Sequence, residues 1–245
     1  MISVSGKKWI ERIINKNSVD KIKQDYGFSE ILAKLIVSRK FNETEIFNIK
    51  NDIEINNKFI SNKDYILASE ILTNSIKNKE KICILGDYDV DGFSSTSLLV
   101  RFFKFIKHPY FYYIPERTKD GYGASKKLFE KLILKQPQLV IMVDCGSTSN
   151  DAVSFLNDKN IKSIIIDHHE INRPYPKSDV IINPKKNDGY GEYDYLCTTT
   201  LTYFLLDLVN KKNKFQYELS SLLIYVLLAS VCDVMPMRKL NRIIA

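Results

Sequence analysis

Three carboxylates fall within five residues in the segment DYDVDG, at Asp87, Asp89 and Asp91. Carboxylates at this spacing repel one another, so without a counter-ion the pKa of some of them would rise. A divalent cation bound between them removes that cost. Gly92 follows the third carboxylate and permits a tight turn in which the backbone approaches closely. The segment therefore predicts a metal site.

Two other segments offer ligands of the same chemical kinds. Asp144 follows the apolar run LVIMV, and the apolar run KSIII is followed by Asp167, His168 and His169. The chain has three histidines, and an adjacent pair behind an aspartate favours metal ligation over a structural role. The remaining histidine, His108, is predicted to be an ordinary surface residue.

The elements that must position these groups are strands alternating with helices. Strands are predicted at residues 81–86, 110–114, 139–143, 162–166 and 180–182, and helices at residues 64–77, 94–106, 125–134, 149–157, 197–209 and 217–231. This alternation predicts an α/β domain with a mostly parallel sheet and helices on both faces. Ligands of such sheets bind beyond the carboxyl ends of the strands, where all three clusters fall.

Two further stretches complete this outline. Ser94 and Ser95 open a predicted helix, where hydroxyl and N–H groups would favour an anion and could bind substrate. Residues 183–195 have the composition of a loop.

A small helical region is predicted before this domain. Residues with helical spacing are Trp9, Ile10, Ile13 and Ile14, and also Ile31, Leu32, Leu35 and Ile36; a further short helix is predicted to start near Asn42. We therefore expect a helical N-terminal region at residues 1–60 and a catalytic domain at residues 61–245.

The composition limits the class of protein. The 245 residues are 44% hydrophobic, which is typical of a globular protein with a sizeable core. No apolar run approaches the roughly 18 residues needed to cross a bilayer, and no signal-peptide pattern is present, so we expect a cytoplasmic protein without a membrane partner. The net charge of +7 suggests nucleic acid as a partner, although abundant Lys, Asn and Ile offer a compositional explanation.

A calcium loop of the EF-hand type is the main structural alternative for DYDVDG. That loop needs a carboxylate at its twelfth position, which is Leu98 when counted from Asp87. Mixed carboxylate and imidazole ligands instead favour manganese, and they are compatible with magnesium, cobalt or zinc. The number of candidate ligands suits two ions about 3.5–4 Å apart, as in phosphatases and nucleases.

Four segments together resemble the motifs of the DHH phosphoesterase superfamily, in order and in spacing. They are DYDVDGFSSTSLL, VDCGST, IDHHE and ASVCDVMPM. Within the superfamily, the RecJ-like family of single-strand-specific exonucleases is the most similar, because IPERTKDGYGAS, YPKSDVIINPKK and the N-terminal helices also match. The resemblance covers essentially the whole chain, and the ordered set of motifs is highly specific.

The resemblance implies roles for individual residues. The implied metal ligands are Asp87, Asp89, Asp91, Asp144, His168 and Asp233, with Asp144 bridging two ions and Asp87 in a supporting position. His169 would lie in or next to the coordination shell and could contact the scissile phosphate, and Asp167 would support the shell. Arg117 is a candidate phosphate contact, with an ordinary surface arginine as the alternative.

The chain departs from the family pattern in three places. Cys145 stands where the family has Asn, and it is one of four cysteines without a CxxC pair, which we otherwise expect to be reduced thiols near the core. Thr198, Thr199 and Thr200 replace a Gly-containing segment. The sequence stops at Ala245, so the second domain and the oligonucleotide-binding domain of RecJ-like proteins are expected to be absent.

The function implied by the resemblance is 5′→3′ exonuclease activity on single-stranded DNA, with two Mn²⁺ or Mg²⁺ ions, in DNA repair and recombination. A monomer is expected, with single-strand-binding protein as a candidate partner. Two alternatives stay open. One is a phosphodiesterase acting on oligoribonucleotides or cyclic dinucleotides, and the other is a non-catalytic fragment that binds metal or nucleic acid.

Overall fold

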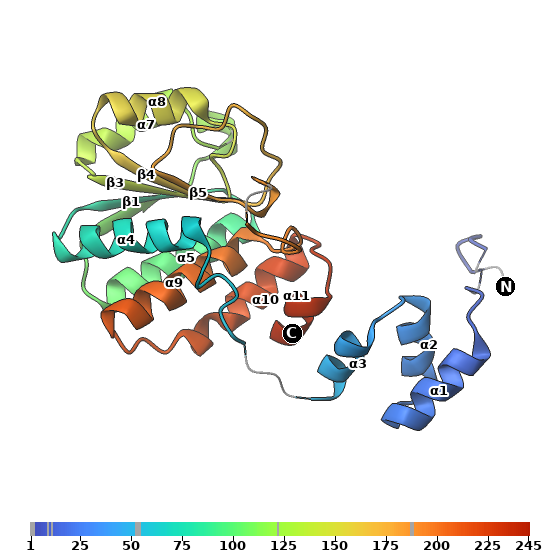
Figure 1. Cartoon of the computed structure of the whole chain (residues 1–245). Coiled ribbons are helices and arrows are strands. Elements are labelled where there is room, and N and C mark those ends of the chain that lie inside the picture. The colour runs from blue at the N-terminus through green and yellow to red at the C-terminus, as the bar shows by residue number, and fades with distance from the viewer. Residues whose placement is uncertain (1–2, 9, 11, 52–54, 122, 187–188) are drawn as a thin grey trace. The chain divides into compact units, whose positions relative to one another are not determined.

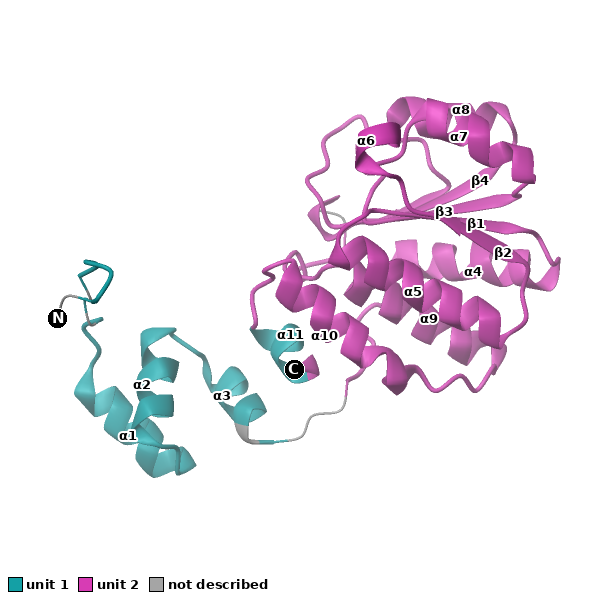
Figure 2. Ribbon diagram, turned by 180° about the vertical axis from the view of Figure 1, so that it is seen from behind, with its two compact units in different colours: residues 1–54, 238–243 teal, residues 55–237, 244–245 magenta. Residues whose placement is uncertain are grey.

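The structure is a computed structural model that describes residues 3–8, 10, 12–51, 55–121, 123–186 and 189–245 (Figure 1). The chain divides into two compact units (Figure 2). One comprises Met1–Glu54 and Arg238–Ile243, and the other comprises Ile55–Met237 and Ile244–Ala245. The predicted catalytic domain at residues 61–245 stays a prediction.

The larger unit is built on a five-stranded sheet. Its strands are β1 (Ile82–Gly86), β2 (Tyr110–Tyr113), β3 (Leu139–Val143), β4 (Lys162–Ile166) and β5 (Val180–Ile182). They lie in the order β2-β1-β3-β4-β5, and every neighbouring pair is parallel. The prediction of a mostly parallel sheet is therefore confirmed. The chain leaves β1 toward β2 and returns across to β3, so a topological switch point lies between β1 and β3.

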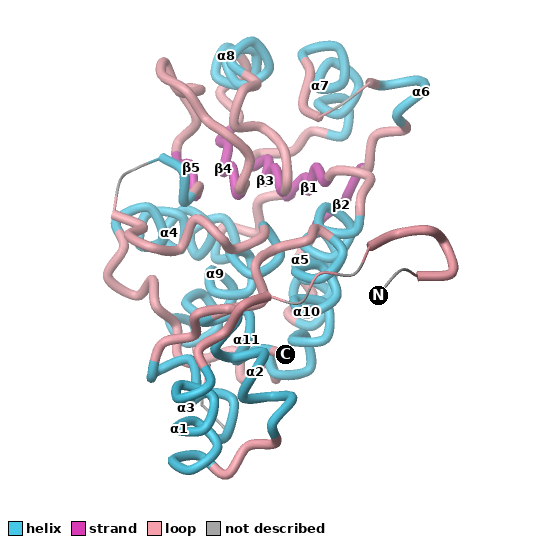
Figure 3. The backbone as a smooth tube through the Cα atoms, turned by 90° about the vertical axis from the view of Figure 1, so that its right-hand side faces the viewer, coloured by secondary structure: helices cyan, strands magenta, loops and turns pink. Residues whose placement is uncertain are grey.

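Helices cover both faces of this sheet, as predicted (Figure 3). One face carries α4 (Lys63–Lys77), α5 (Val90–Phe105) and α9 (Thr198–Asn213), with α10 (Leu223–Cys232) packed against α5 and α9. The other face carries α7 (Lys126–Leu132) and α8 (Asn150–Asp158). A short helix, α6 (Arg117–Asp120), precedes α7. The strands are continuous apolar runs because side chains on both faces are buried under helices.

Several helices of this unit differ from the sequence prediction; for example, α9 runs four residues beyond its predicted end at residue 209, and α6 was not predicted. Helix α5 begins at Val90 instead of residue 94, because the side chain of Asp89 caps it by accepting a hydrogen bond from the N–H of Gly92 at 2.9 Å. The helix predicted at residues 217–231 is divided into a 3₁₀ turn, Leu219–Leu222, and α10. In the described part of the chain, no helix is both long and apolar enough to cross a bilayer.

The smaller unit contains α1 (Lys16–Tyr26), α2 (Glu30–Ser38) and α3 (Glu43–Lys50), together with most of α11 (Lys239–Ile244). The helix predicted near Asn42 is confirmed: Asn42 and Glu45 form a reciprocal capping box at the amino end of α3. The helix predicted near Ile10 and Ile13 is wrong, since both side chains are exposed and α1 begins after Asn15. Trp9 lies outside the described residues.

Candidate metal centre

The acidic clusters meet because of the strand register. Asp87, Asp144 and Asp167 each follow the last residue of a strand, and those last residues of β1, β3 and β4 pair with one another. The N–H of Asp144 continues this ladder by donating to the carbonyl of Ile166 at 3.0 Å. The three carboxylates therefore lie side by side at the carboxyl edge of the sheet, next to the switch point.

The turn between β1 and α5 brings the second and third carboxylates of DYDVDG to the same edge. Asp89 caps α5, and Asp91 lies in its first turn. Gly92 is needed here, because a Cβ at this position would lie 2.5 Å from the carbonyl oxygen of Asp87. A larger residue would push the helix away from the strand that it follows.

The carboxylate of Asp91 is held by the amino end of α9. Its Oδ2 accepts from the N–H of Thr198 at 2.7 Å, and its Oδ1 accepts from the N–H and the hydroxyl of Thr199 at 2.8 and 2.6 Å. Cys197, the N-cap residue of α9, makes no side-chain capping bond, so Asp91 takes that place. Both oxygens are oriented, and Oδ2 keeps a lone pair for a cation.

His168 lies among three carboxylates. Its Nε2 is 3.7 Å from Oδ2 of Asp91, 3.5 Å from Oδ1 of Asp144 and 3.3 Å from Oδ2 of Asp233. Asp233 reaches this position from the end of α10, and the next residue, Val234, has a φ of 55°, which is rare for a β-branched side chain.

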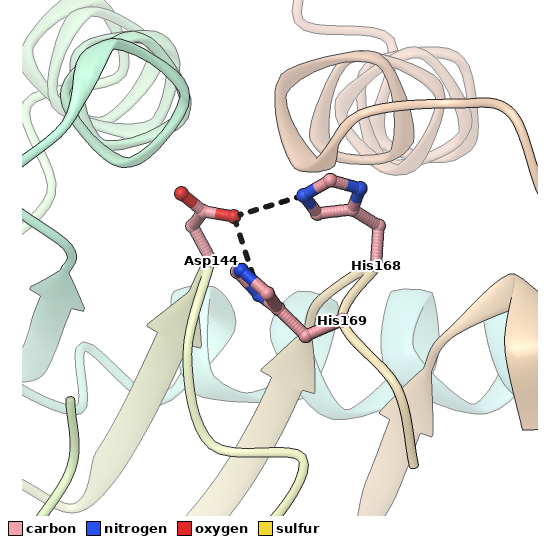
Figure 4. A group of neighbouring side chains, drawn as sticks. All are labelled: Asp144, His168 and His169. Atoms are coloured by element: carbon pink, nitrogen blue, oxygen red, sulfur yellow. Dashed lines mark ion pairs between the residues drawn. The ribbon is translucent and has the colours of Figure 1, made fainter. Parts of the chain in front are cut away.

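The rings of His169 and His168 both point toward the carboxylate of Asp144 (Figure 4). Nδ1 of His169 is 3.9 Å from Oδ1 of Asp144 and 2.8 Å from Oδ1 of Asp167. The pKa of His169 is raised, chiefly by the hydrogen bond to Asp167. Burial alone would raise the pKa of Asp167, but hydrogen bonds from His169 and from the N–H of Ser147 outweigh burial and lower it. A carboxylate behind an imidazole of this kind fixes the orientation of the ring.

Asp144 is the least compensated charge of the group. Its side chain is fully buried, and its Oδ2 has no hydrogen-bond partner in the described part of the chain. Burial and the neighbouring carboxylates of Asp91 and Asp89 raise the pKa of Asp144 to about 11. Asp144 also has a φ of 61°, a left-handed conformation of the kind found at functional sites. Burial raises the pKa of Asp233 too, and Oδ2 of that residue likewise has no hydrogen-bond partner among the described residues.

These side chains fit a pair of divalent cations. Three groups have ligand atoms within 4.8 Å of one another, namely Asp144, His168 and His169; Asp91, His168 and Asp233; and Asp87, Asp89 and Asp144. Ligand atoms about 2.1 Å from a shared ion lie roughly 3–4 Å apart, and the distances between the two imidazoles and the carboxylates given above are in this range. The last two groups have no residue in common, and each contains one of the two buried carboxylate oxygens without a partner among the described residues, those of Asp233 and Asp144. The donor set therefore suits two ions.

The predicted substrate contacts are placed differently. Arg117 is exposed and its guanidinium lies over the ring of Tyr88, 5.5 Å from the centroid, which brings it beside the DYDVDG turn. Ser94 and Ser95 are 4% and 0% exposed, and the hydroxyl of Ser95 donates to the carbonyl of Asp91 at 2.8 Å. Because α5 begins four residues earlier than predicted, both serines lie inside the helix and are buried. Their contact with a substrate stays a prediction.

Two further residues singled out in the sequence, His108 and Cys145, lie outside the three ligand groups. His108 is buried, contrary to its predicted surface position, and its Nε2 makes a 2.8 Å hydrogen bond with the carbonyl of Glu80. Cys145 packs into the apolar cluster beneath α7 and α8, and it is in none of the three ligand groups. Its replacement of an Asn therefore adds no ligand to this centre.

Sequence reasoning did not assign roles to Thr198 and Thr199. Their hydroxyls donate to Asp144 and Asp91, at 3.0 and 2.6 Å. The run of three threonines at a helix start, close to acidic motifs, was the available signal, because threonine is a common capping residue. Which acidic groups the threonines bind depends on contacts with residues 54 and 108 positions away along the chain.

Residues 81–230 match the family model described as DHH family, N-terminal domain. The single-stranded-DNA-specific exonuclease RecJ of Haemophilus influenzae is 32% identical over 187 residues, which are 73% of this chain and 32% of that protein. The RecJ of Bacillus subtilis is 26% identical over 244 residues, or 98% of this chain and 30% of that protein. The chain thus spans about a third of the length of these curated relatives.

A solved structure has the same fold. RecJ from Thermus thermophilus in complex with Mn²⁺ matches with a TM-score of 0.75 at 19% identity, over 93% of this chain and 32% of that one. The family model runs from β1 into α10 and so includes the strand ends that form the centre. The chain belongs to the DHH family.

Proposed function

We propose that this chain is the catalytic core of a metal-dependent exonuclease that hydrolyses single-stranded DNA from its 5′ end. The observation that carries the proposal is the buried carboxylate of Asp144, which has an oxygen without a partner among the described residues and lies beside His168. A surplus of buried negative charge is the environment that a cation completes. The substrate is supported by the RecJ relatives, which are named as single-stranded-DNA-specific exonucleases.

Six side chains would hold the two ions. Asp91, His168 and Asp233 would bind one, and Asp87, Asp89 and Asp144 would bind the other. Manganese or magnesium bound there would supply Lewis-acid stabilisation of charge on the phosphoryl oxygens. Thr198 and Thr199 would keep the two central carboxylates in position by hydrogen bonding.

His169 is proposed as the catalytic side chain that contacts the phosphate. Its side chain is 44% exposed, whereas that of His168 is 8% exposed, so His169 is the imidazole that a substrate can reach. Asp167 engages Nδ1 and raises the pKa of His169, which favours an imidazolium able to donate to a phosphate oxygen. Asp167 is therefore proposed as a positioning residue.

Arg117 is proposed as a further phosphate contact. Its guanidinium is exposed and is stacked on Tyr88, inside the DYDVDG segment. A guanidinium held in this way can form paired hydrogen bonds to a phosphate with little loss of freedom. We further propose that the protein acts in DNA repair and recombination in the cytoplasm. It would act as a monomer, and single-strand-binding protein is a candidate partner.

The test measures Mn²⁺ binding and digestion on the same sample. We expect mononucleotides to be released from 5′-labelled single-stranded DNA, faster than a dinucleotide or a cyclic dinucleotide is hydrolysed. His168→Ala should abolish both binding and digestion. His108→Ala is the matched control, because it removes a buried histidine that lies outside the ligand groups.

The outcomes separate the alternatives. Faster hydrolysis of dinucleotides than of DNA would replace the exonuclease by a phosphodiesterase acting on small nucleotides. Metal binding without turnover would indicate a non-catalytic fragment. This alternative arises because the chain spans only about a third of the length of its curated relatives. If His168→Ala and Asp89→Ala left binding unchanged, the proposed centre itself would be wrong.

A further inference from the structure

Asn183 lies directly after β5, in the place that Asp144 and Asp167 take after β3 and β4. The last residues of β4 and β5 are paired in register, so Asn183 and Asp167 lie side by side. Asn183 is 0% exposed. Its amide is therefore a buried polar group at the edge of the sheet that forms the metal centre.

Both N–H donors and the oxygen of this amide make hydrogen bonds. Its Nδ2 donates to the hydroxyl oxygen of Ser147 at 2.8 Å and to the carbonyl oxygen of His169 at 2.9 Å. Its Oδ1 accepts from the N–H of Lys185 at 2.9 Å. The opposite amide orientation would place two oxygens against each other at His169, so only this orientation satisfies the site.

The two acceptors lead to the same imidazole by separate routes. The contact with the carbonyl of His169 restrains the backbone from which the ring projects. The contact with Ser147 restrains the residue whose N–H donates to Oδ2 of Asp167 at 3.1 Å. Asp167 in turn binds Nδ1 of His169 through its other oxygen, at 2.8 Å.

We propose that Asn183 is a positioning residue that sets the orientation of the His169 imidazole, by tying together the loops that follow β3, β4 and β5. The expected effect on the rate rests on the proposed function, whereas the positioning of His169 by Asn183 does not depend on it. Small displacements of a catalytic group lower the rate strongly, because the reacting geometry is narrow. Supporting residues of this kind typically change activity by about 10–100-fold.

The test compares three single variants. Asn183→Ala removes both donations. Asn183→Asp keeps the size of the side chain but puts an oxygen opposite the carbonyl of His169, so it breaks that contact without leaving a cavity. Asn210→Ala is the matched control, because Asn210 also bonds backbone groups, the carbonyl and the N–H of Tyr217, in a region of α9 outside the ligand groups. Thermal unfolding of each variant sets an assay temperature at which all are folded.

The kinetic result expected is a fall in kcat of about 10–100-fold for both Asn183 variants, with KM little changed. In a His169→Ala background, Asn183→Ala should cause almost no further fall in kcat, because Asn183 acts through the imidazole that this background lacks. Asn210→Ala should lower the unfolding temperature and leave kcat unchanged. An undiminished effect of Asn183→Ala in the His169→Ala background would overturn the proposal.

A second measurement does not depend on turnover. The chain has three histidines, so the ring nitrogen signals of a ¹⁵N-histidine-labelled, metal-free sample can be assigned with His169→Ala and His108→Ala. We expect the His169 signals to shift in both Asn183 variants and to stay in place in Asn210→Ala. Unchanged His169 signals would refute the positioning role even if the enzyme were active, whereas shifted signals in an inactive chain would refute only the proposed exonuclease.

Discussion

At the amino edge of the sheet, where the strands begin, ionisable side chains bind one another, whereas at the carboxyl edge they are crowded without enough partners. Glu80, just before β1, accepts from the hydroxyl of Ser75 at 2.6 Å and from Nζ of Lys162 at 3.1 Å. The backbone carbonyl of Glu80 accepts a hydrogen bond from Nε2 of His108. At the opposite edge, Asp144 has a buried oxygen without a partner among the described residues.

The pKa shifts of the two edges run in opposite directions. Burial would raise the pKa of Glu80, but Ser75 and Lys162 outweigh it and the pKa is lowered. Burial and neighbouring carboxylates raise the pKa of Asp144. A buried or half-buried acid is stabilised in the charged form only when partners are supplied. The amino edge is therefore complete as folded, whereas the carboxyl edge would be completed by the cations that we propose bind there.

Of the substitutions considered, Asp144→Asn should reduce the difference between the two edges of the sheet most strongly. Metal affinity should fall by more than about 100-fold, because the loss of a ligand exceeds the effect of a supporting residue. Denaturant unfolding in the presence of chelator should show the metal-free variant to be as stable as the wild type, or more stable by about 1–3 kcal/mol, because a buried carboxyl group that has an oxygen without a partner among the described residues and lies among other carboxylates is gone. Calorimetric titration supplies the affinity. Retained metal affinity together with lost metal-free stability would contradict this account.

Thr199→Val tests whether α9 prepares Asp91 for a cation. The hydroxyl that donates to Oδ1 of Asp91 is lost at nearly constant side-chain volume, so we expect metal affinity to fall by about tenfold. Thr202→Val is the matched control on the same helix. The Thr202 hydroxyl is buried and has no hydrogen-bond partner among the described residues, so its loss should leave metal affinity unchanged. Equal affinities in the two variants would rule out this role for Thr199.

Metal affinity should rise with pH. The pKa values of Asp87, Asp144 and Asp233 are raised in the folded chain, so these groups retain protons that the unfolded chain releases above its ordinary carboxyl pKa. Stability without metal therefore falls as pH rises from about 4, and a cation must displace the retained protons. Titration with Mg²⁺ between about pH 6 and about pH 8 should show up to a tenfold gain per pH unit for each displaced proton. A flat profile would mean that the carboxylates are already ionised.

Glu80→Gln should have the smallest effect, and it tests whether the amino edge influences the metal centre at the carboxyl edge. The ion pair with the half-exposed Lys162 is lost, which should lower the free energy of unfolding by about 1 kcal/mol or less. Metal affinity should not change, because the residue lies at the other edge of the sheet. Denaturant unfolding and the same metal titration check both statements, and a changed affinity would show that the two edges are coupled.

Much of the fold could be predicted from the sequence because the signals are local. The runs LVIMV and KSIII gave strands with the bounds that the structure has, since a short apolar run between polar turns has few other stable conformations. The start of α5 was misplaced because Asp89 was considered as a ligand and not as a helix cap. His108 was misjudged because its partner, a carbonyl before β1, is not a feature that a residue type can signal.

By itself, the sequence determined which residues could bind cations and which strands they follow, because side-chain chemistry and apolar runs are written in adjacent positions. Only the tertiary structure decided how those residues combine. It brought Asp233 from α10 to within 3.3 Å of His168, and it placed α9 so that Thr199 holds Asp91. It also buried Asp144 more deeply than its described partners could compensate. Those contacts join segments far apart in the chain, and their energy depends on burial and register, which exist only once the sheet and its helices have packed together.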